Sequence, residues 1–208
     1  MNDHIKRFQS KNGLKVNGIV NKETALKIGE KLSLDRKELI NFLGQIDAIT
    51  SFEAKRENTN FSKIKLKKEY SDLFDDRRIK MYLEKPQAIA NRCYANKYGN
   101  RGEDSGDGYN FRGNGFFKLK GRDFHVEFSK FVGVDCVENT DLIIDEYLFE
   151  NAKYFFDKNK LWDSMREVSI EKISQTTEKL NKLLNITHRE LKKVDNRIEK
   201  VLMYEKMI

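Results

Sequence analysis

The amino-acid sequence predicts a mainly helical fold with one short strand or hairpin. Apolar residues recur at helical spacing along much of the 208-residue chain. The chain has a single proline, Pro86, and seven of its twelve glycines fall between Gly99 and Gly121. Proline interrupts helices, and glycine permits tight turns and the close approach of a ligand. We therefore expect helices on both sides of one glycine-rich loop.

The first clear helical pattern covers residues 39–46, where five apolar side chains form one stripe. A second stripe covers residues 79–83, Pro86 ends or restarts it, and a third continues over residues 89–94. These patterns predict helices before and after the proline.

Two further helices are expected beyond the glycine-rich loop. Residues 142–156 are apolar at helical spacing, and a stripe from Leu191 to Leu202 has Lys and Glu on its other face. The second pattern predicts an amphipathic helix that packs on the core. Within the glycine-rich segment, Phe116, Phe117 and Leu119 predict the short strand or hairpin.

The charge balance favours an anionic partner. The chain carries 40 basic and 33 acidic residues, for a net charge of +7, and a basic surface attracts nucleic acid, anionic lipid or an anionic bacterial envelope. The 14 Phe and 8 Tyr argue against disorder. No apolar run approaches the roughly 18 residues of a membrane span, and no signal peptide is visible.

Cysteine and histidine usage predicts neither a disulfide nor a metal site. Cys93 and Cys136 lie in unlike contexts, and two buried thiols are favoured over a disulfide. Three histidines and two cysteines without metal-ligand spacing do not suggest zinc. We expect no cofactor and no metal.

The glycine-rich loop carries three acids, Glu103, Asp104 and Asp107, and is a candidate site. It lacks the spacing of a phosphate-binding loop, and its acids would repel phosphate. The acid spacing also lacks the alternating ligands of an EF-hand. Two interpretations stay open at this point, a functional loop and a surface loop with solvated acids.

This part of the chain resembles glycoside hydrolase family 19, the chitinase-like family used by many phage endolysins. The resemblance spans about residues 35–200 and implies a lysozyme/chitinase-like helical domain. It rests on segments in a specific order: Asn41-Phe-Leu-Gly-Gln-Ile, Glu57-Asn-Thr-Asn-Phe-Ser, residues 89–100, Glu103, Ser105-Gly-Asp-Gly-Tyr-Asn-Phe-Arg-Gly-Asn-Gly, Leu119-Lys-Gly-Arg and Asn151-Ala-Lys-Tyr-Phe-Phe.

The N-terminus resembles the second half of a small peptidoglycan-binding repeat. The similarity covers residues 5–25, and the first half of the repeat is missing. So short a segment cannot bury a core alone, so it must pack on the main domain or stay loose. The resemblances together predict a partial wall-binding segment at residues 1–32 and a family 19-like domain at residues 33–208. A vestigial helix and turn is the alternative for the first segment.

The family resemblance implies hydrolysis of a β-1,4 glycosidic bond with inversion, which needs a general acid and a general base. The base position falls on Glu103. The acid normally lies in a His-Glu-Ser/Thr triplet, which reads Ala48-Ile49-Thr50 here, and isoleucine cannot donate a proton. Glu53 lies one helical turn beyond Ile49 if that helix continues, and is the candidate for a displaced acid. We expect Ile49 to lie opposite Glu103.

The resemblance also implies substrate-binding positions at Tyr109, Arg112, Lys118, Lys120 and Asn181. Lys118 and Lys120 stand where the family has a glutamine and a small hydroxyl residue that helps to place water. On a strand, two residues this far apart share one face. We expect these two lysines to make the groove cationic and to favour an anionic wall polymer. By the same resemblance, Leu180-Asn181 corresponds to a later loop of the family in which two glycines follow the asparagine.

Two functions from different classes follow. The first is a cell-wall glycan hydrolase of the chitinase/endolysin type, acting on peptidoglycan or chitin, with activity reduced or lost because of Ile49. The second is a degenerate relative that binds glycan or a partner through the same groove. Nucleic-acid binding rests on charge alone. We expect a monomer, made in the cytoplasm, that acts at the bacterial cell wall after release.

Overall fold

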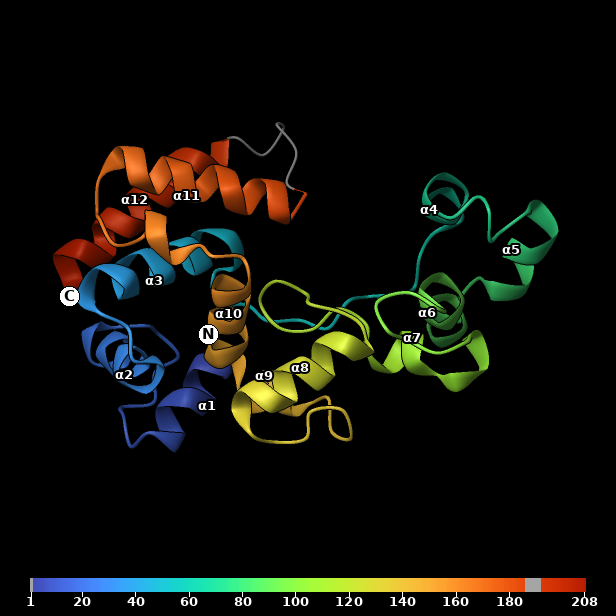
Figure 1. The fold of residues 1–208 in the computed structure, drawn as a ribbon, viewed down its shortest axis with the longest axis horizontal. Helices are drawn as coiled ribbons and strands as arrows, with labels where there is room; N and C mark the ends of the chain where they lie inside the picture. Colours follow the sequence, from blue (N-terminus) through green and yellow to red (C-terminus); the bar gives the residue numbers. More distant parts are fainter. Residues whose placement is uncertain (1, 186–191) are drawn as a thin grey trace. The chain divides into compact units, whose positions relative to one another are not determined.

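The computed structural model describes residues 2–185 and 192–208 (Figure 1). Leu191, which begins the predicted C-terminal stripe, lies outside the described residues. The chain forms two compact units: residues 1–54 with 145–208, and residues 55–144. Most described residues lie in helices, which confirms the predicted fold class.

The first unit is built around α3. Its helices are α1 (Asp3–Lys11), α2 (Lys22–Leu32), α3 (Arg36–Thr50), α10 (Leu148–Lys158), the short 3₁₀ helix η2 (Trp162–Ser164), α11 (Ile170–Leu183) and α12 (Lys192–Met207). All ten residues from Leu39 to Ala48 are buried, so α3 is enclosed on every side, as expected for a central helix.

Two local features fix α3. Asp35 and Glu38 form a capping box at its N-terminus, in which each side chain accepts a hydrogen bond from the other residue's backbone N–H. Near its middle, a Cβ added to Gly44 would lie 2.5 Å from a side-chain carbon of Val201 on α12. Glycine therefore permits the close packing of α3 and α12.

The N-terminal segment packs into the first unit and is not loose. The amide of Gln9 is buried and donates to Asn17 Oδ1 (2.9 Å), the Ile19 carbonyl (2.9 Å) and Thr24 Oγ1 (3.0 Å). Its oxygen accepts from the backbone N–H groups of Asn17 and Gly18. One side chain thus orders the loop between α1 and α2. The predicted boundary between residues 32 and 33 stays a prediction.

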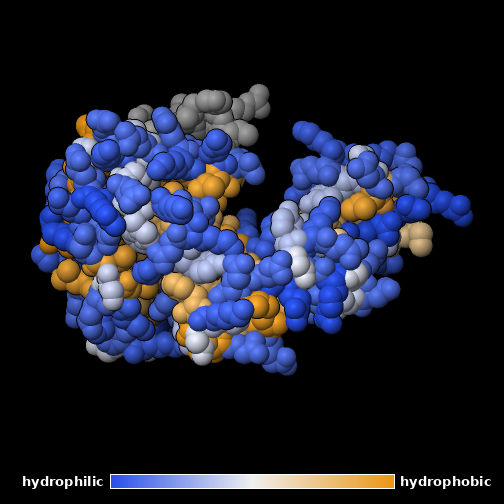
Figure 2. Space-filling view, in the orientation of Figure 1, coloured by the Kyte–Doolittle hydropathy of each residue, from blue (hydrophilic) through white to orange (hydrophobic). Residues whose placement is uncertain are grey.

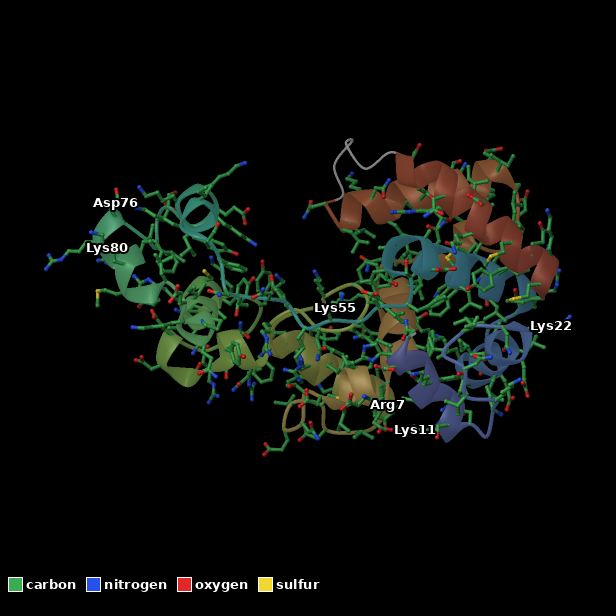
Figure 3. All side chains as sticks on the ribbon, turned by 180° about the vertical axis from the view of Figure 1, so that it is seen from behind. Arg7, Lys11, Lys22, Lys55, Asp76 and Lys80 are labelled. Atoms are coloured by element: carbon green, nitrogen blue, oxygen red, sulfur yellow. The ribbon has the colours of Figure 1, made fainter. Side chains whose placement is uncertain are left out.

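Charged side chains on α1 add to this attachment. Arg7 and Lys11 lie one turn apart on the same helix (Figure 3) and form ion pairs with Asp145 and Glu146. All four side chains are substantially exposed, so these pairs add little stability beyond the apolar contacts.

The second unit contains the glycine-rich loop. Its helices are α4 (Lys63–Glu69), α5 (Asp76–Tyr82), α6 (Pro86–Tyr94), η1 (Glu103–Ser105), α7 (Asp107–Asn110), α8 (Arg122–Val132) and the start of α9 (Leu142–Asp145). Pro86 begins α6, in the first turn where a helix tolerates proline, and so restarts the helical pattern. The apolar core of α4, α5 and α6 is Phe61, Leu66, Phe74, Ile79, Ile89, Ala90, Cys93 and Tyr94.

The glycine-rich loop packs closely on α6. A Cβ added to Gly108 would lie 2.4 Å from the Ala90 carbonyl oxygen, so no larger residue fits without a shift of the backbone. The predicted short hairpin is reduced to one antiparallel bridge between Asn114 and Leu119. The Asn114 N–H donates to the Leu119 carbonyl at 3.0 Å.

Polar and charged residues cover most of the face of the molecule seen in Figure 2. Among the described residues, no helix combines the length and apolar character needed to cross a bilayer. Cys93 and Cys136 are buried free thiols, as predicted.

The buried imidazole of His125 on α8 predicts acid sensitivity. Burial lowers the pKa of His125 to about 4, against the effect of the Gly121 carbonyl and with a further contribution from Arg56. Nδ1 donates to that carbonyl over 2.8 Å. An unfolded histidine titrates near 6.5, so as pH falls from about 6.5 the unfolded chain takes up the proton first, and the folded state loses stability. The loss by pH 4.5 is about 2–3 kcal/mol.

We expect His125→Asn, whose amide can still donate to the Gly121 carbonyl, to lose less stability than the wild type between pH 7 and pH 4.5. Urea unfolding at both pH values measures this difference. Equal losses in the two proteins would contradict the assignment.

Candidate functional site

The loop that carries Glu103 is held by Asp107. The Asp107 carboxylate accepts hydrogen bonds from the guanidinium of Arg101 at 2.9 and 3.0 Å and from its backbone N–H at 3.0 Å. The hydrogen bond from the Arg101 side chain is the main reason that the pKa of Asp107 is lowered. Asp107 is therefore a structural carboxylate, which leaves the partly exposed Glu103 and the exposed Asp104 as the other acids of the loop.

Glu103 begins η1 and is held by two side chains of the same unit. Oε1 accepts from the Tyr82 hydroxyl at 2.8 Å, and Oε2 accepts from the Arg92 guanidinium at 3.0 Å. Arg92 also donates to the Tyr82 hydroxyl and to the Leu73 carbonyl. Burial and the hydrogen bond to Glu103 raise the pKa of Tyr82, so Tyr82 stays a proton donor in this arrangement.

The Glu103 carboxylate can still accept a further proton or hydrogen bond. Its side chain is 33% exposed, and each carboxylate oxygen has two lone pairs, of which Tyr82 and Arg92 occupy one apiece. This geometry fits a carboxylate with fixed orientation and access to solvent. The open groove that we expect around Glu103 stays a prediction.

A second polar centre is formed by Glu57. Its side chain is 15% exposed and accepts from the Tyr94 hydroxyl at 2.8 Å, from the Gly113 N–H at 3.2 Å and from Lys120 Nζ at 3.2 Å. Burial alone would raise the pKa of Glu57, but Lys120, Tyr94 and Gly113 together hold it below its ordinary value. Burial and the Glu57 charge raise the pKa of Tyr94, which keeps its hydroxyl protonated.

The prediction that Lys118 and Lys120 share one face of a strand is wrong. Lys118 has a φ of 51°, outside the extended region, and its side chain is exposed. Lys120 donates to both oxygens of Glu57 and lies 4.7 Å from the centre of the Tyr94 ring. The tight turn before Leu119 separates the two lysines, and Lys120 is already neutralised by an internal partner.

The expected continuation of the helix from Ile49 to Glu53 is also wrong. Helix α3 ends at Thr50, and both Ser51 and Phe52 have positive φ values, which no α-helix tolerates in its interior. Ile49 is half-buried and Glu53 is exposed in the loop that follows. Both belong to the first unit and Glu103 belongs to the second, so the pairing of either with Glu103 stays a prediction.

Tyr109 lines a hollow of about 400 Å³ together with the start of α6, at Lys85, Pro86, Gln87 and Ala88. The Arg112 guanidinium lies 3.8 Å from the centre of the Tyr109 ring and donates to the Tyr109 carbonyl. The Arg112 guanidinium therefore covers one face of the Tyr109 ring and holds the ring in place. The ring and the amide of Gln87 give this hollow a mixed apolar and polar lining.

Asn181 lies within α11 and not in a loop. Its side-chain oxygen accepts from the Arg197 guanidinium at 2.6 Å. It belongs to the first unit, and its expected role in substrate binding stays a prediction.

Three side chains around the two carboxylates were not singled out from the sequence: Tyr82, Arg92 and Tyr94. Arg92 and Tyr94 lie two residues apart in the Asn-Arg-Cys-Tyr segment of the resemblance, which could have drawn attention to them. Tyr82 carries no such signal, because its role depends on how α5 packs against α6.

A comparison with protein-family models finds no match. A curated protein of Haemophilus influenzae, described as a glycosyl hydrolase family 19 domain-containing protein, is 32% identical over 131 residues. The match covers 62% of this chain and 62% of that protein, so the chain spans about three fifths of the length of its relative. This similarity supports a family 19-like relationship.

The Glu57–Lys120 pair predicts a pH-dependent contribution to stability. Because Lys120→Met leaves a largely buried carboxylate without its cation, we expect the free energy of unfolding at pH 7 to fall by about 1–3 kcal/mol. The folded-state pKa of Glu57 lies below its ordinary value of 4.5. Its contribution is therefore present above about pH 4.5 and is lost as pH falls further, so the deficit of the variant should shrink in acid.

Denaturant unfolding at pH 7 and pH 3.5 measures the effect. Lys118→Met removes the same charge from an exposed site nearby and is the matched control, expected to be near neutral. A Lys120→Met protein as stable as the control at pH 7 would refute the role of the pair.

Proposed function

We propose that this chain is a glycan hydrolase of the family 19 type that acts on the β-1,4 bonds of peptidoglycan or chitin, with Glu103 as the general base. The main support is the position of Glu103 in the glycine-rich motif, where Tyr82 and Arg92 fix its carboxylate and one third of the side chain stays exposed. A base that activates water for inversion needs such a fixed, accessible carboxylate.

The proposed activity is weak, because Ile49 stands at the position of the general acid. The loss of a general acid typically slows a reaction by about 10²–10⁴-fold. The exposed Glu53 lies four residues further along the chain and beyond the end of α3. It is the only replacement that we proposed from the sequence, and it lacks the helical register on which that proposal depended.

The Glu57–Lys120 pair favours a second function, glycan or partner binding without hydrolysis. By resemblance, Lys120 replaces a small hydroxyl residue that helps to place the attacking water. In this chain its ammonium is engaged by Glu57 and Tyr94. A cation fixed by internal partners is a poor substitute for that hydroxyl, so retention of the fold without efficient chemistry is the alternative.

The cell-wall setting is part of the proposal. A basic chain with a wall-binding-like N-terminal segment suits an anionic bacterial envelope. We place its action at that wall, as for an endolysin.

Restoration of the acid should raise the activity. We expect Ile49→Glu to release reducing ends from peptidoglycan or chitin oligomers about 10²–10⁴-fold faster than the wild type, because a half-buried carboxyl can supply the missing proton. Incubation with each polymer, followed by a reducing-end assay, measures this gain.

Glu103→Gln combined with Ile49→Glu should abolish the gain, whereas Asp104→Asn, an adjacent exposed acid with the same loss of charge, should preserve it. If Ile49→Glu releases reducing ends no faster than the wild type, with or without Asp104→Asn, and the wild type still binds glycan, the binding function replaces the hydrolase proposal. A gain that survives Glu103→Gln would overturn the base assignment.

A further inference from the structure

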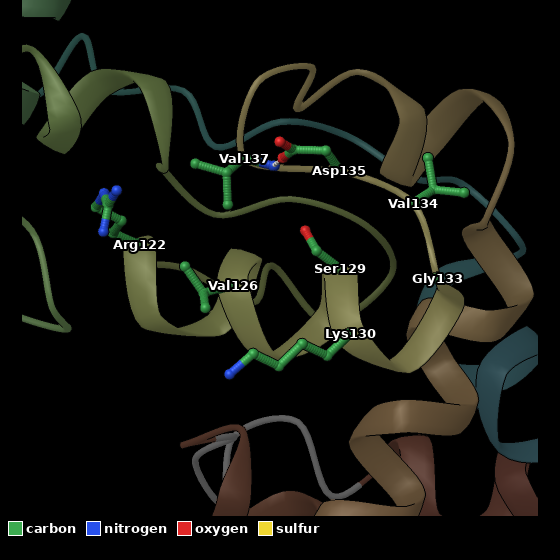
Figure 4. A pocket seen from close by; sticks show the side chains of 8 residues that line it. All are labelled: Arg122, Val126, Ser129, Lys130, Gly133, Val134, Asp135 and Val137. Atoms are coloured by element: carbon green, nitrogen blue, oxygen red, sulfur yellow. Dashed lines mark hydrogen bonds between the residues drawn. The ribbon is translucent and has the colours of Figure 1, made fainter.

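One face of α8 borders an open hollow of about 490 Å³ in the second unit (Figure 4). Arg122, Val126 and Lys130 follow one another at intervals of four residues, so they lie along the same side of the helix. The loop after α8 supplies the opposite wall through Val134, Asp135 and Val137.

The two cations of this hollow have no ion-pair partner among the described residues. No carboxylate of the described chain lies within ion-pair distance of Arg122 or Lys130, although Arg122 acts on Asp107 at longer range. The backbone N–H of Arg122 is separately bonded to Asn100. Both guanidinium and ammonium groups are therefore available to an external anion.

The polar groups of the loop after α8, and Ser129 on α8 itself, are already engaged. Asp135 accepts from the backbone N–H groups of Val137 at 2.8 Å and Glu138 at 3.0 Å. Ser129 donates to the His125 carbonyl and accepts from the Cys136 N–H. These bonds shape the loop. Because the Asp135 carboxylate repels anions, an anion is held more favourably on the α8 side of the hollow, near Arg122 and Lys130.

Between the charges the surface is apolar. Val126 lies between the two cations along the helix, Val137 lies across from it, and Val134 lines the hollow further along, next to Gly133 (Figure 4). Val134 is 37% exposed. A ligand that suits this surface has an aliphatic body and carries two separated anionic groups.

The spacing of the cations sets the length of that ligand. Eight residues separate Arg122 from Lys130, which corresponds to about 12 Å along the helix axis. An extended peptide advances roughly 3.3–3.6 Å per residue. Two carboxylates on alternate residues span about this distance when the first belongs to a γ-linked glutamate, because its side chain then lengthens the path between them.

We propose that this hollow binds the short, carboxylate-bearing peptide of peptidoglycan, with Arg122 and Lys130 on its carboxylates and the valines on its small aliphatic side chains. This inference rests on the proposed function for the choice of a cell-wall polymer, and it selects peptidoglycan over chitin, whose neutral chain carries no such peptide. A phosphate polymer would satisfy the cations and leave the valines without a partner.

The test uses the full chain and a synthetic peptide, L-Ala-γ-D-Glu-L-Lys-D-Ala, at low salt. Titration followed by amide NMR should shift signals of residues 122–137. Arg122→Gln and Lys130→Gln should each raise the dissociation constant about two- to fivefold, since exposed ion pairs are worth about this much. Lys68→Gln, an exposed lysine of α4 with the same change of charge, should leave it unchanged.

Two controls separate the contributions. The same peptide with amidated carboxylates should bind the wild type no more tightly than the free peptide binds the Arg122→Gln/Lys130→Gln double variant. Added salt should weaken the binding of the free peptide and leave that of the amidated peptide unchanged. Equal binding of both peptides, shifts outside residues 122–137, or tighter binding of a glycerol-phosphate oligomer than of the peptide would overturn the proposal.

This outcome is independent of hydrolysis. Glu103→Gln should bind the peptide as the wild type does. Peptide binding without release of reducing ends would reject the hydrolase function and keep this site, whereas hydrolysis without peptide binding would reject this site alone.

Discussion

The second unit depends on one largely buried carboxylate, that of Glu57. Away from water, a charged carboxylate is stable only when donors replace its hydration, and Glu57 receives them from Lys120, Tyr94 and Gly113. The Glu57 N–H also donates to the Gly113 carbonyl at 2.7 Å. The extended segment before α4, the glycine-rich loop and α6 are therefore fixed to one another at a single point.

The same constraint reaches the candidate site and alters its chemistry. Arg92 lies on α6 two residues before Tyr94, so the helix that serves Glu57 also supplies the cation that orients Glu103. Two carboxylates are thus held by one short helix, and each has its own cation. With its ammonium committed to Glu57, Lys120 has become part of the scaffold, while the proposed base Glu103 keeps its access to solvent.

The sequence predicted what local spacing determines. The apolar stripes located α3, α5 and α6, Pro86 marked the boundary between α5 and α6, and composition identified Cys93 and Cys136 as buried thiols. It could not predict where the side chains of Lys118 and Lys120 lie. The backbone of Lys118 is left-handed, and Lys120 pairs with Glu57, which is 63 residues away in the sequence. The end of α3 at Thr50 was missed for a similar reason, since no glycine or proline marks it. The roles assigned to Glu103, Tyr109 and Asn181 rest on resemblance and remain predictions.

Under the proposed function, Glu103 still acts as the base of a glycan hydrolase whose general acid is lost. A chito-oligosaccharide with a dinitrophenolate leaving group tests it most directly, because this leaving group departs without protonation and makes a general acid unnecessary. The wild type should release dinitrophenolate, and Glu103→Gln should release it about 10²–10⁴-fold more slowly. Equal rates in the two proteins, or no turnover by a wild type that binds the substrate, would contradict the claim.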